Sequence, residues 1–168
     1  MRDRIFIDTN VFVYAFLEPK DDSDKQKHLQ AIGLLNSIKE FNVFISVQVL
    51  NEFYNSLLKY RINDNKIQQK LQQIIDVVFV APISIDTVIK SWKIRLKYKF
   101  SYYDSLIVAS ALENNCSILY TEDLQDGQVI ENALKIVNPF KGNDCRGCKG
   151  CRGCRGGRGG RSSKFNVL

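Results

Sequence analysis

The sequence predicts an α/β fold in which helices connect the strands of a parallel sheet. Short apolar runs alternate with segments of helical periodicity between residues 5 and 137. Parallel strands need crossover connections of about a dozen residues or more, and the helical segments supply them. In such sheets ligands bind beyond the carboxyl ends of the strands, so polar residues that directly follow a strand are the first candidates for function.

The N-terminal segment predicts one strand followed by two helices. An apolar run at residues 5–7 ends in helix-capping residues, and residues 11–17 then form a helix that stops near Pro19. Acidic residues 21–24 form a loop that starts the next helix, over about residues 25–39.

The middle of the chain continues the alternation. Residues 43–45 form the second strand, and residues 66–75 form a helix. Between them, residues 48–60 predict an amphipathic helix. Its apolar side chains recur at helical spacing and comprise Leu50, Phe53, Tyr54, Leu57 and Leu58.

The remaining elements complete the sheet. Residues 77–80 are β-branched and aromatic and predict a strand. Helices are expected over residues 85–98 and 102–113, and the second of these is apolar on most sides and should be buried. Residues 117–120 and 135–137 form the last two strands.

Composition changes sharply near Phe140, where we place a domain boundary. Residues 141–168 carry a net charge of +7 and a CRGCKGCRGCRGG run, whereas residues 1–140 have a net charge of −1. This Cys/Arg/Gly-rich tail has almost nothing to bury and is expected to be disordered. The basic pI of about 9.1 belongs to the tail, so it gives no argument that the body binds nucleic acid.

The composition also limits the chemistry of the body. His28 is the one histidine and is expected at the surface, and Cys116 is the one cysteine before the tail, so a His/Cys zinc site is excluded there. No apolar run is long enough to span a bilayer and no signal peptide is apparent, so a cytoplasmic location is expected. Carboxylates are abundant, and their hard oxygen atoms suit Mg²⁺ or Mn²⁺.

Three carboxylates each have a structural and a chemical interpretation. Asp8 follows the first strand and could cap a helix, although Thr9 or Asn10 could do so equally well. Glu52 lies opposite the apolar stripe of its helix, which by itself predicts a solvated side chain. Asp104 completes the S-x-x-D pattern of a capping box in a helix that should be buried, and the same carboxylate could bind a cation.

A second acidic group follows the strand at residues 117–120. Glu122, Asp123 and Asp126 could form a polar loop, or they could provide ligands at the carboxyl edge of the sheet beside Asp8. Glu122 could also simply face solvent.

Several motifs together resemble the PIN-domain ribonucleases of the VapC type, the toxins of VapBC toxin–antitoxin pairs. FIDTNVFVYA, SVQVLNEFYN, FSYYDSLIVASALENNCSILYTEDLQDGQ and IVNPF occur in the order and spacing of that family. The resemblance covers residues 5–140. It implies a PIN nuclease domain over residues 1–140, folded as a three-layer α/β/α sandwich with a central parallel sheet.

The resemblance also implies the site residues. It assigns the catalytic acids to Asp8, Glu52, Asp104 and Asp123, with Asp8, Asp104 and Asp123 as metal ligands. The T-x-D-x-x-D motif leaves Asp126 as the other candidate for the fourth acid, and we prefer Asp123. Supporting roles fall to the remaining matched positions, which are Thr9, Asn10, Thr121 and Asp126.

The activity implied is a Mg²⁺- or Mn²⁺-dependent endoribonuclease, with RNA as substrate, a cognate antitoxin as protein partner and a homodimer as the assembly. A cation would relieve the repulsion between the clustered carboxylates and activate a water for attack on the phosphate. Two alternatives are a catalytically silent PIN-type RNA-binding module and an RNA-processing PIN nuclease outside any toxin–antitoxin pair. The tail departs from the family pattern, and we expect its deletion to leave folding and cleavage intact.

Overall fold

The computed structural model of this protein describes residues 3–141 and contains a six-stranded sheet of order β3-β2-β1-β4-β6-β5. All neighbouring strands are parallel except β5 and β6, which are antiparallel. The strands are β1 (Arg4–Ile7), β2 (Asn42–Ser46), β3 (Phe79–Ala81), β4 (Ile118–Tyr120), β5 (Val129–Ile130) and β6 (Leu134–Val137).

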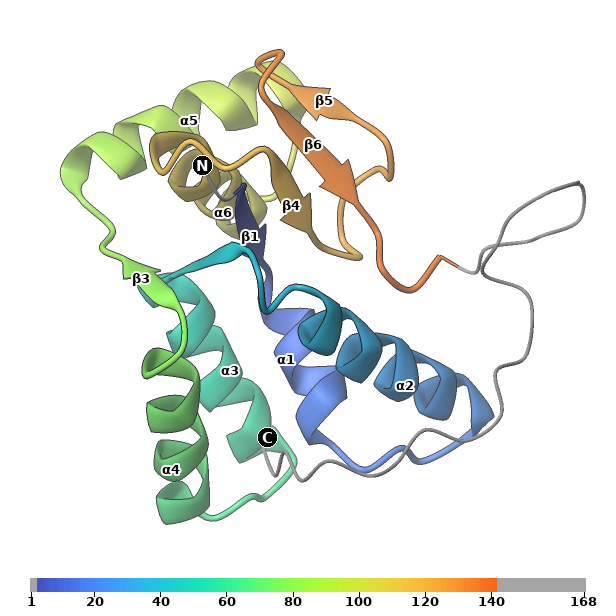
Figure 1. Cartoon of the computed structure of the whole chain (residues 1–168). Coiled ribbons are helices and arrows are strands. Elements are labelled where there is room, and N and C mark those ends of the chain that lie inside the picture. The colour runs from blue at the N-terminus through green and yellow to red at the C-terminus, as the bar shows by residue number, and fades with distance from the viewer. Residues whose placement is uncertain (1–2, 142–168) are drawn as a thin grey trace, which may run out of the picture.

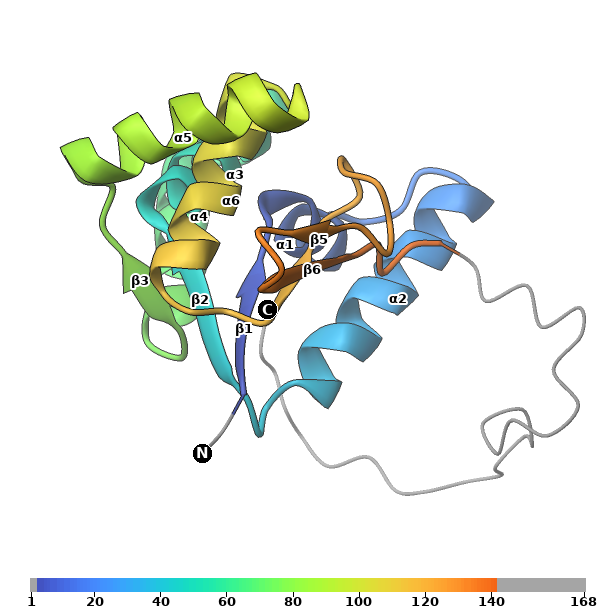
Figure 2. The same ribbon diagram turned by 90° about the horizontal axis from the view of Figure 1, so that it is seen from above.

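Helices cover both faces of the sheet. They are α1 (Thr9–Phe16), α2 (Asp22–Ser37), α3 (Val47–Lys59), α4 (Asp64–Ile75), α5 (Ile85–Tyr98) and α6 (Tyr102–Glu113). Helices α5 and α6 pack together on one face, and α1 to α4 form the layer on the other face (Figure 1). Seen from above, α5 and α6 lie in front of α3 and α4 (Figure 2). This is the expected three-layer α/β/α sandwich.

The pairing of the central strands β1 and β4 determines which residues meet at the carboxyl edge of the sheet. The register pairs Ile7 of β1 with Tyr120 of β4, so the residues that follow the two strands meet at the carboxyl edge of the sheet. Two backbone hydrogen bonds continue the pairing past the strand ends: the Asp8 N–H donates to the Tyr120 carbonyl at 3.0 Å, and the Thr121 N–H donates to the Val137 carbonyl at 3.1 Å. Three of the four residues of β1 are buried, and so is Leu119 at the centre of β4, which fixes this edge in place.

Helix α6 is the most buried of the described helices. The sequence predicted its burial because the segment is apolar on most sides. Seven consecutive residues, from Ser105 to Ala111, are buried. The helix packs against α5 and also contacts α3 and β2, so a side chain in its first turn can reach the same edge as the ends of the strands.

Some predicted boundaries were wrong. The first helix begins at Thr9 rather than at residue 11, because Asp8 caps it. The supposed acidic loop is mostly helical, since α2 starts at Asp22. The third strand lies at Phe79–Ala81 rather than at residues 77–80, and Val77 is exposed in the preceding turn.

Strand β5 was missed altogether, and it makes the sheet mixed at one edge rather than wholly parallel. It contains only two residues and pairs with β6, so it leaves no alternating pattern to detect. The predicted tail, residues 141–168, lies outside the described residues except for Lys141. Within residues 3–141, none of the helices is long and apolar enough to cross a membrane.

Candidate active site

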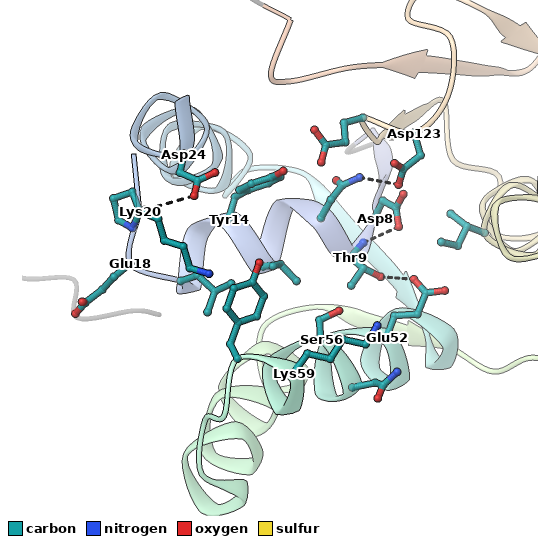
Figure 3. A pocket seen from close by; sticks show the side chains of 18 of the residues that line it. Asp8, Thr9, Tyr14, Glu18, Lys20, Asp24, Glu52, Ser56, Lys59 and Asp123 are labelled. Atoms are coloured by element: carbon teal, nitrogen blue, oxygen red, sulfur yellow. Dashed lines mark hydrogen bonds between the residues drawn. The ribbon is translucent and has the colours of Figure 1, made fainter. Parts of the chain in front are cut away.

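A pocket of about 410 Å³ opens at the carboxyl edge of the sheet and brings four acidic residues together. They come from the end of β1, from α3, from α6 and from the loop after β4, and comprise Asp8, Glu52, Asp104 and Asp123. These four residues are far apart in the sequence, and the pairing of β1 with β4 accounts for the approach of two of them. Figure 3 shows Asp8, Thr9, Glu52 and Asp123 lying close together at one end of the pocket.

Asp8 is the buried member of the group, with only 3% of its surface exposed. It is the N-cap of α1, where its carboxylate accepts the Thr9 N–H at 2.6 Å. The second carboxylate oxygen accepts the Thr121 hydroxyl at 2.6 Å. Asp8 therefore does cap the helix, and the prediction that a neighbour could do this instead is wrong. Capping leaves lone pairs on both oxygens, so the carboxylate can still take a further ligand.

The electrostatics around Asp8 disfavour its charged form. Burial raises the pKa of Asp8 to about 7, and the nearby carboxylates of Asp123 and Glu52 add to the rise. The hydrogen bonds from Thr121 and Thr9 act in the opposite direction but do not cancel the effect of burial. A cation beside Asp8 would relieve this penalty.

Glu52 faces the pocket rather than open solvent, so the expectation from its helical periodicity is wrong. The Thr9 hydroxyl donates to one Glu52 oxygen at 2.8 Å, and the Gln48 amide donates to the other at 2.7 Å. Gln48 precedes Glu52 by one helical turn, and Thr9 connects Glu52 to the capping residue of α1. Thr9 thus bridges two of the four acidic positions.

Two neighbours hold Asp123 in place: Asn10 of the D-T-N motif and Thr121 of the T-x-D motif. The Asn10 amide donates to the Asp123 carboxylate at 3.2 Å, and the Asp123 N–H donates to the Thr121 hydroxyl at 3.1 Å. Burial raises the pKa of Asp123, and the charges of Asp104 and other neighbouring carboxylates raise it further. Thr121 therefore contacts both Asp8 and Asp123 through one hydroxyl.

Asp104 lies in the first turn of α6, and its local contacts contain half of the expected capping box. The Asp104 N–H donates to the Ser101 hydroxyl at 3.2 Å, as an N-cap requires. The carboxylate accepts that same hydroxyl at 2.6 Å, but within residues 3–141 it accepts no hydrogen bond from the Ser101 N–H. Asp104 is half-buried and lines the pocket.

The other two acids of the loop after β4 are engaged elsewhere. Asp126 does not line the pocket; it accepts the Asn138 N–H at 3.0 Å and lies 3.5 Å from the Lys141 ammonium. Glu122 lines the pocket rim but pairs with Lys27 of α2 at 2.6 Å, which corrects the expectation that it faces solvent. Sequence reasoning gave no signal for Lys27, because its partner is 95 positions away.

His28 is also less exposed than expected. It is half-buried, and its Nδ1 lies 2.8 Å from the carbonyl oxygen of Tyr14. This contact ties α2 to α1 on the side of the helix that also carries Lys27, so the histidine has a structural partner outside the acidic group.

The donor chemistry of the pocket fits a hard divalent cation. Carboxylate oxygens line it, Asp8 is buried without a compensating charge, and the Asn10 Oδ1 is buried with no hydrogen-bond partner within residues 3–141. Within those residues, however, no group of three or more His, Cys, Asp or Glu side chains is already arranged to hold a metal ion. Binding would therefore require the acidic side chains to turn toward one another.

Fold and site together define an α/β domain with an acidic pocket at the carboxyl edge of its sheet. This chain belongs to the PIN-domain family, whose model matches residues 5–126. PIN-domain nucleases generally use divalent metal ions.

The fold is similar to solved structures of toxin–antitoxin proteins. A toxin–antitoxin complex from Klebsiella pneumoniae is 21% identical, with a TM-score of 0.59 over 80% of this chain and 97% of that one. FitAcB from Neisseria gonorrhoeae is 18% identical, with a TM-score of 0.61 over 82% and 99%. VapC20 from Mycobacterium tuberculosis, described as a Sarcin-Ricin loop cleaving toxin, is 21% identical, with a TM-score of 0.54 over 68% and 86%. A search of curated proteins finds no match.

Proposed function

We propose that this protein is a divalent-metal-dependent endoribonuclease and the toxin of a toxin–antitoxin pair. The observation that carries the proposal is the convergence of four carboxylates from four separate elements in one pocket of a PIN domain. Carboxylates placed so close together are mutually repulsive, and a structural role for all four gives no account of why they share one cavity.

The residues would divide the work as follows. Asp8, Asp104 and Asp123 would hold Mg²⁺ or Mn²⁺, and the ion would supply polarisation of the scissile phosphate and a lower pKa for a bound water. Glu52 accepts a proton or orients water beside Asp8, where the Thr9 hydroxyl holds its carboxylate. Thr9 and Thr121 hold the carboxylates of Glu52 and Asp8 through hydroxyl donors. Asn10 holds Asp123.

The contacts favour Asp123 over Asp126 as the fourth acid. Asp123 lines the pocket and is repelled by Asp104, whereas Asp126 is bound to Asn138 and Lys141. We therefore assign to Asp126 the accessory role of fastening the loop that carries Asp123.

A catalytically silent RNA-binding module is the weaker candidate. An uncharged side chain could cap α1 in such a module, so the module gains nothing from a buried carboxylate that is costly to ionise beside two further acids. An RNA-processing nuclease outside a toxin–antitoxin pair would use the same site. The toxin–antitoxin complexes among the similar folds favour an antitoxin partner.

Cleavage of total RNA tests the proposal. With Mg²⁺ or Mn²⁺ we expect discrete cuts, mapped by sequencing the new 5′ ends, and we expect none in excess EDTA. Restoring Mg²⁺ to the EDTA-treated sample should restore the cuts. RNA that stays intact in Mg²⁺ and Mn²⁺ would contradict the proposed activity.

A homodimer is supported by an apolar stripe on α5. Four side chains recur every three or four residues along one face of this helix and are 39–75% exposed: Ile85, Ile89, Trp92 and Leu96. Large exposed apolar patches on soluble proteins mark interaction surfaces. We propose that two copies bury the stripe through a two-fold interface.

Replacing Trp92 with glutamate should therefore give a monomer. The charge would have to be buried without a partner, which costs several kcal/mol. Light scattering coupled to size-exclusion chromatography measures the mass. The matched control is Leu29→Glu on α2, which changes another apolar side chain that is 61% exposed. A dimer that persists in Trp92→Glu, or that is lost in Leu29→Glu, would contradict the assignment of α5.

A further inference from the structure

The pocket extends well beyond the four acids of the candidate site, and its other end adds basic and aromatic side chains to two further acids, Glu18 and Asp24. The segment after α1 and the C-terminal part of α3 line that end, contributing Lys20, Lys59 and Tyr60. Figure 3 shows Lys20 and Lys59 extending into the pocket from these two different elements, with the amino end of Lys59 directed toward Ser56 and Glu52. The whole pocket is of the size that holds a small ligand, since binding pockets measure about 300–1,000 Å³.

The two lysines have no ion-pair partner among the described residues, although acidic side chains line the same pocket. By contrast, Lys27 at the neighbouring rim is paired with Glu122. The Lys20 ammonium lies instead 4.5 Å from the centre of the Tyr60 ring.

An anion is the ligand that two unpaired ammonium groups on facing elements would attract. A nucleic-acid strand needs such groups here, because the carboxylates at the other end of the pocket repel its phosphates. Tyr60 is 46% exposed at the end of α3, so its ring is available to a planar partner. Aromatic rings that stack on bases beside cations that contact phosphates are the usual means of holding single-stranded nucleic acid.

We infer that Lys20, Lys59 and Tyr60 form a nucleotide subsite that holds the RNA residue next to the scissile phosphate. This inference rests on the proposed ribonuclease function and adds where the substrate lies. Each ammonium group contacts a phosphate of the strand, and the tyrosine ring stacks on a base beside Lys20. When RNA binds, Lys20 leaves the Tyr60 ring and contacts a phosphate. Little is lost by this exchange, because a cation–π contact is weak at an exposed site.

The test compares RNA binding by the full-length protein and by Lys20→Gln/Lys59→Gln. A fluorescent single-stranded RNA is titrated in EDTA, so that it stays intact, over a series of salt concentrations. We expect the Kd of the double variant to rise about tenfold at low salt. The slope of log affinity against log salt should fall by about 1.4, because each contact of a single strand contributes about 0.7. The control is Lys25→Gln/Lys66→Gln, which changes exposed lysines of α2 and α4 outside the pocket and should bind as the parent protein does.

Tyr60 provides a second and independent measurement. Tyr60→Phe keeps the ring and should bind RNA like the parent protein, whereas Tyr60→Leu should bind several-fold more weakly. With cleavable RNA and Mg²⁺, the lysine and leucine variants should raise KM and leave kcat little changed, because they act on substrate binding.

The outcomes separate the subsite from the proposed activity. If the parent protein cleaves RNA and the lysine variant has the same Kd, salt slope and KM, the subsite is wrong and the activity stands. If the parent protein binds RNA with the expected dependence on the two lysines but never cleaves it, the activity is wrong and the subsite stands. Circular dichroism of each variant confirms that the fold is intact.

Discussion

Asp104→Asn is expected to leave the protein folded and to lower the rate of RNA cleavage by about a hundredfold or more. Asparagine is nearly isosteric with aspartate and can still accept the Ser101 hydroxyl, so the first turn of α6 keeps its cap. The change removes a negative charge from the pocket, however, and with it one of the proposed ligands of the cation. The capping interpretation of Asp104 alone predicts no such loss.

The measurement combines cleavage rates in Mg²⁺ with circular dichroism on the same sample. Asp86→Asn is the matched control, because Asp86 also lies in the first turn of a helix, α5, but is exposed and outside the pocket. We expect the control to cleave at the parent rate. Undiminished cleavage by a folded Asp104→Asn protein would show that Asp104 only helps to cap α6 and is not needed for catalysis.

The second large effect concerns stability. Asp8→Asn is expected to stabilise the metal-free protein at pH 8.5 by up to about 4 kcal/mol, since each unit of pKa shift corresponds to about 1.4 kcal/mol. The pKa of Asp8 is raised from 3.8 to about 7 by burial and by its acidic neighbours. The folded protein therefore retains a proton that the unfolded chain releases, and it loses stability as the pH rises from about 4 to about 7. Asparagine has no charge to bury, so its advantage should vanish near pH 4.

Urea unfolding at pH 4.5 and pH 8.5 in EDTA gives the free energies. Asp21→Asn is the control: Asp21 also caps a helix, accepting the Asp24 N–H at 2.8 Å, but it is exposed. Added Mg²⁺ should stabilise the parent protein and have little effect on Asp8→Asn, because a ligand stabilises only the state that binds it. If Asp8→Asn is less stable than the parent at pH 8.5, the lost hydrogen bonds outweigh the buried charge and the electrostatic account of Asp8 is wrong.

The parts of the site that could be predicted from the pattern alone lie at the ends of strands and in α6. Asp8 and Asp123 follow apolar runs, and parallel strands bring such positions to one edge of a sheet. Asp104 sits at the start of a segment too apolar to be exposed, so its carboxylate had to lie at a boundary of the core.

Glu52 shows where the pattern fails. Helical periodicity separates apolar from polar faces, but it cannot distinguish a polar face in solvent from one that lines a pocket. Only the family resemblance placed Glu52 with the other acids, and its hydrogen bond with Thr9 depends on how α1 and α3 pack.

Hydrogen bonds and ion pairs between residues far apart in the sequence could not be predicted either. The bonds of Lys27 to Glu122 and of Asn138 to Asp126 decide which acids remain available in the pocket, and neither leaves a local signature. Strand β5 was missed for a related reason, since two residues are too few to show a period and pairing with β6 alone defines it.

The central claim is that Asp8, Asp104 and Asp123 act together as a metal site. Diffraction from crystals soaked in Mn²⁺, with data collected at the manganese absorption edge, tests it directly. We predict an anomalous peak in the pocket within bonding distance of carboxylate oxygens from these three residues, and no such peak in crystals of Asp8→Asn. A protein that cleaves RNA in Mn²⁺ yet shows its manganese elsewhere, or coordinated by Asp126 in place of Asp123, would contradict the account.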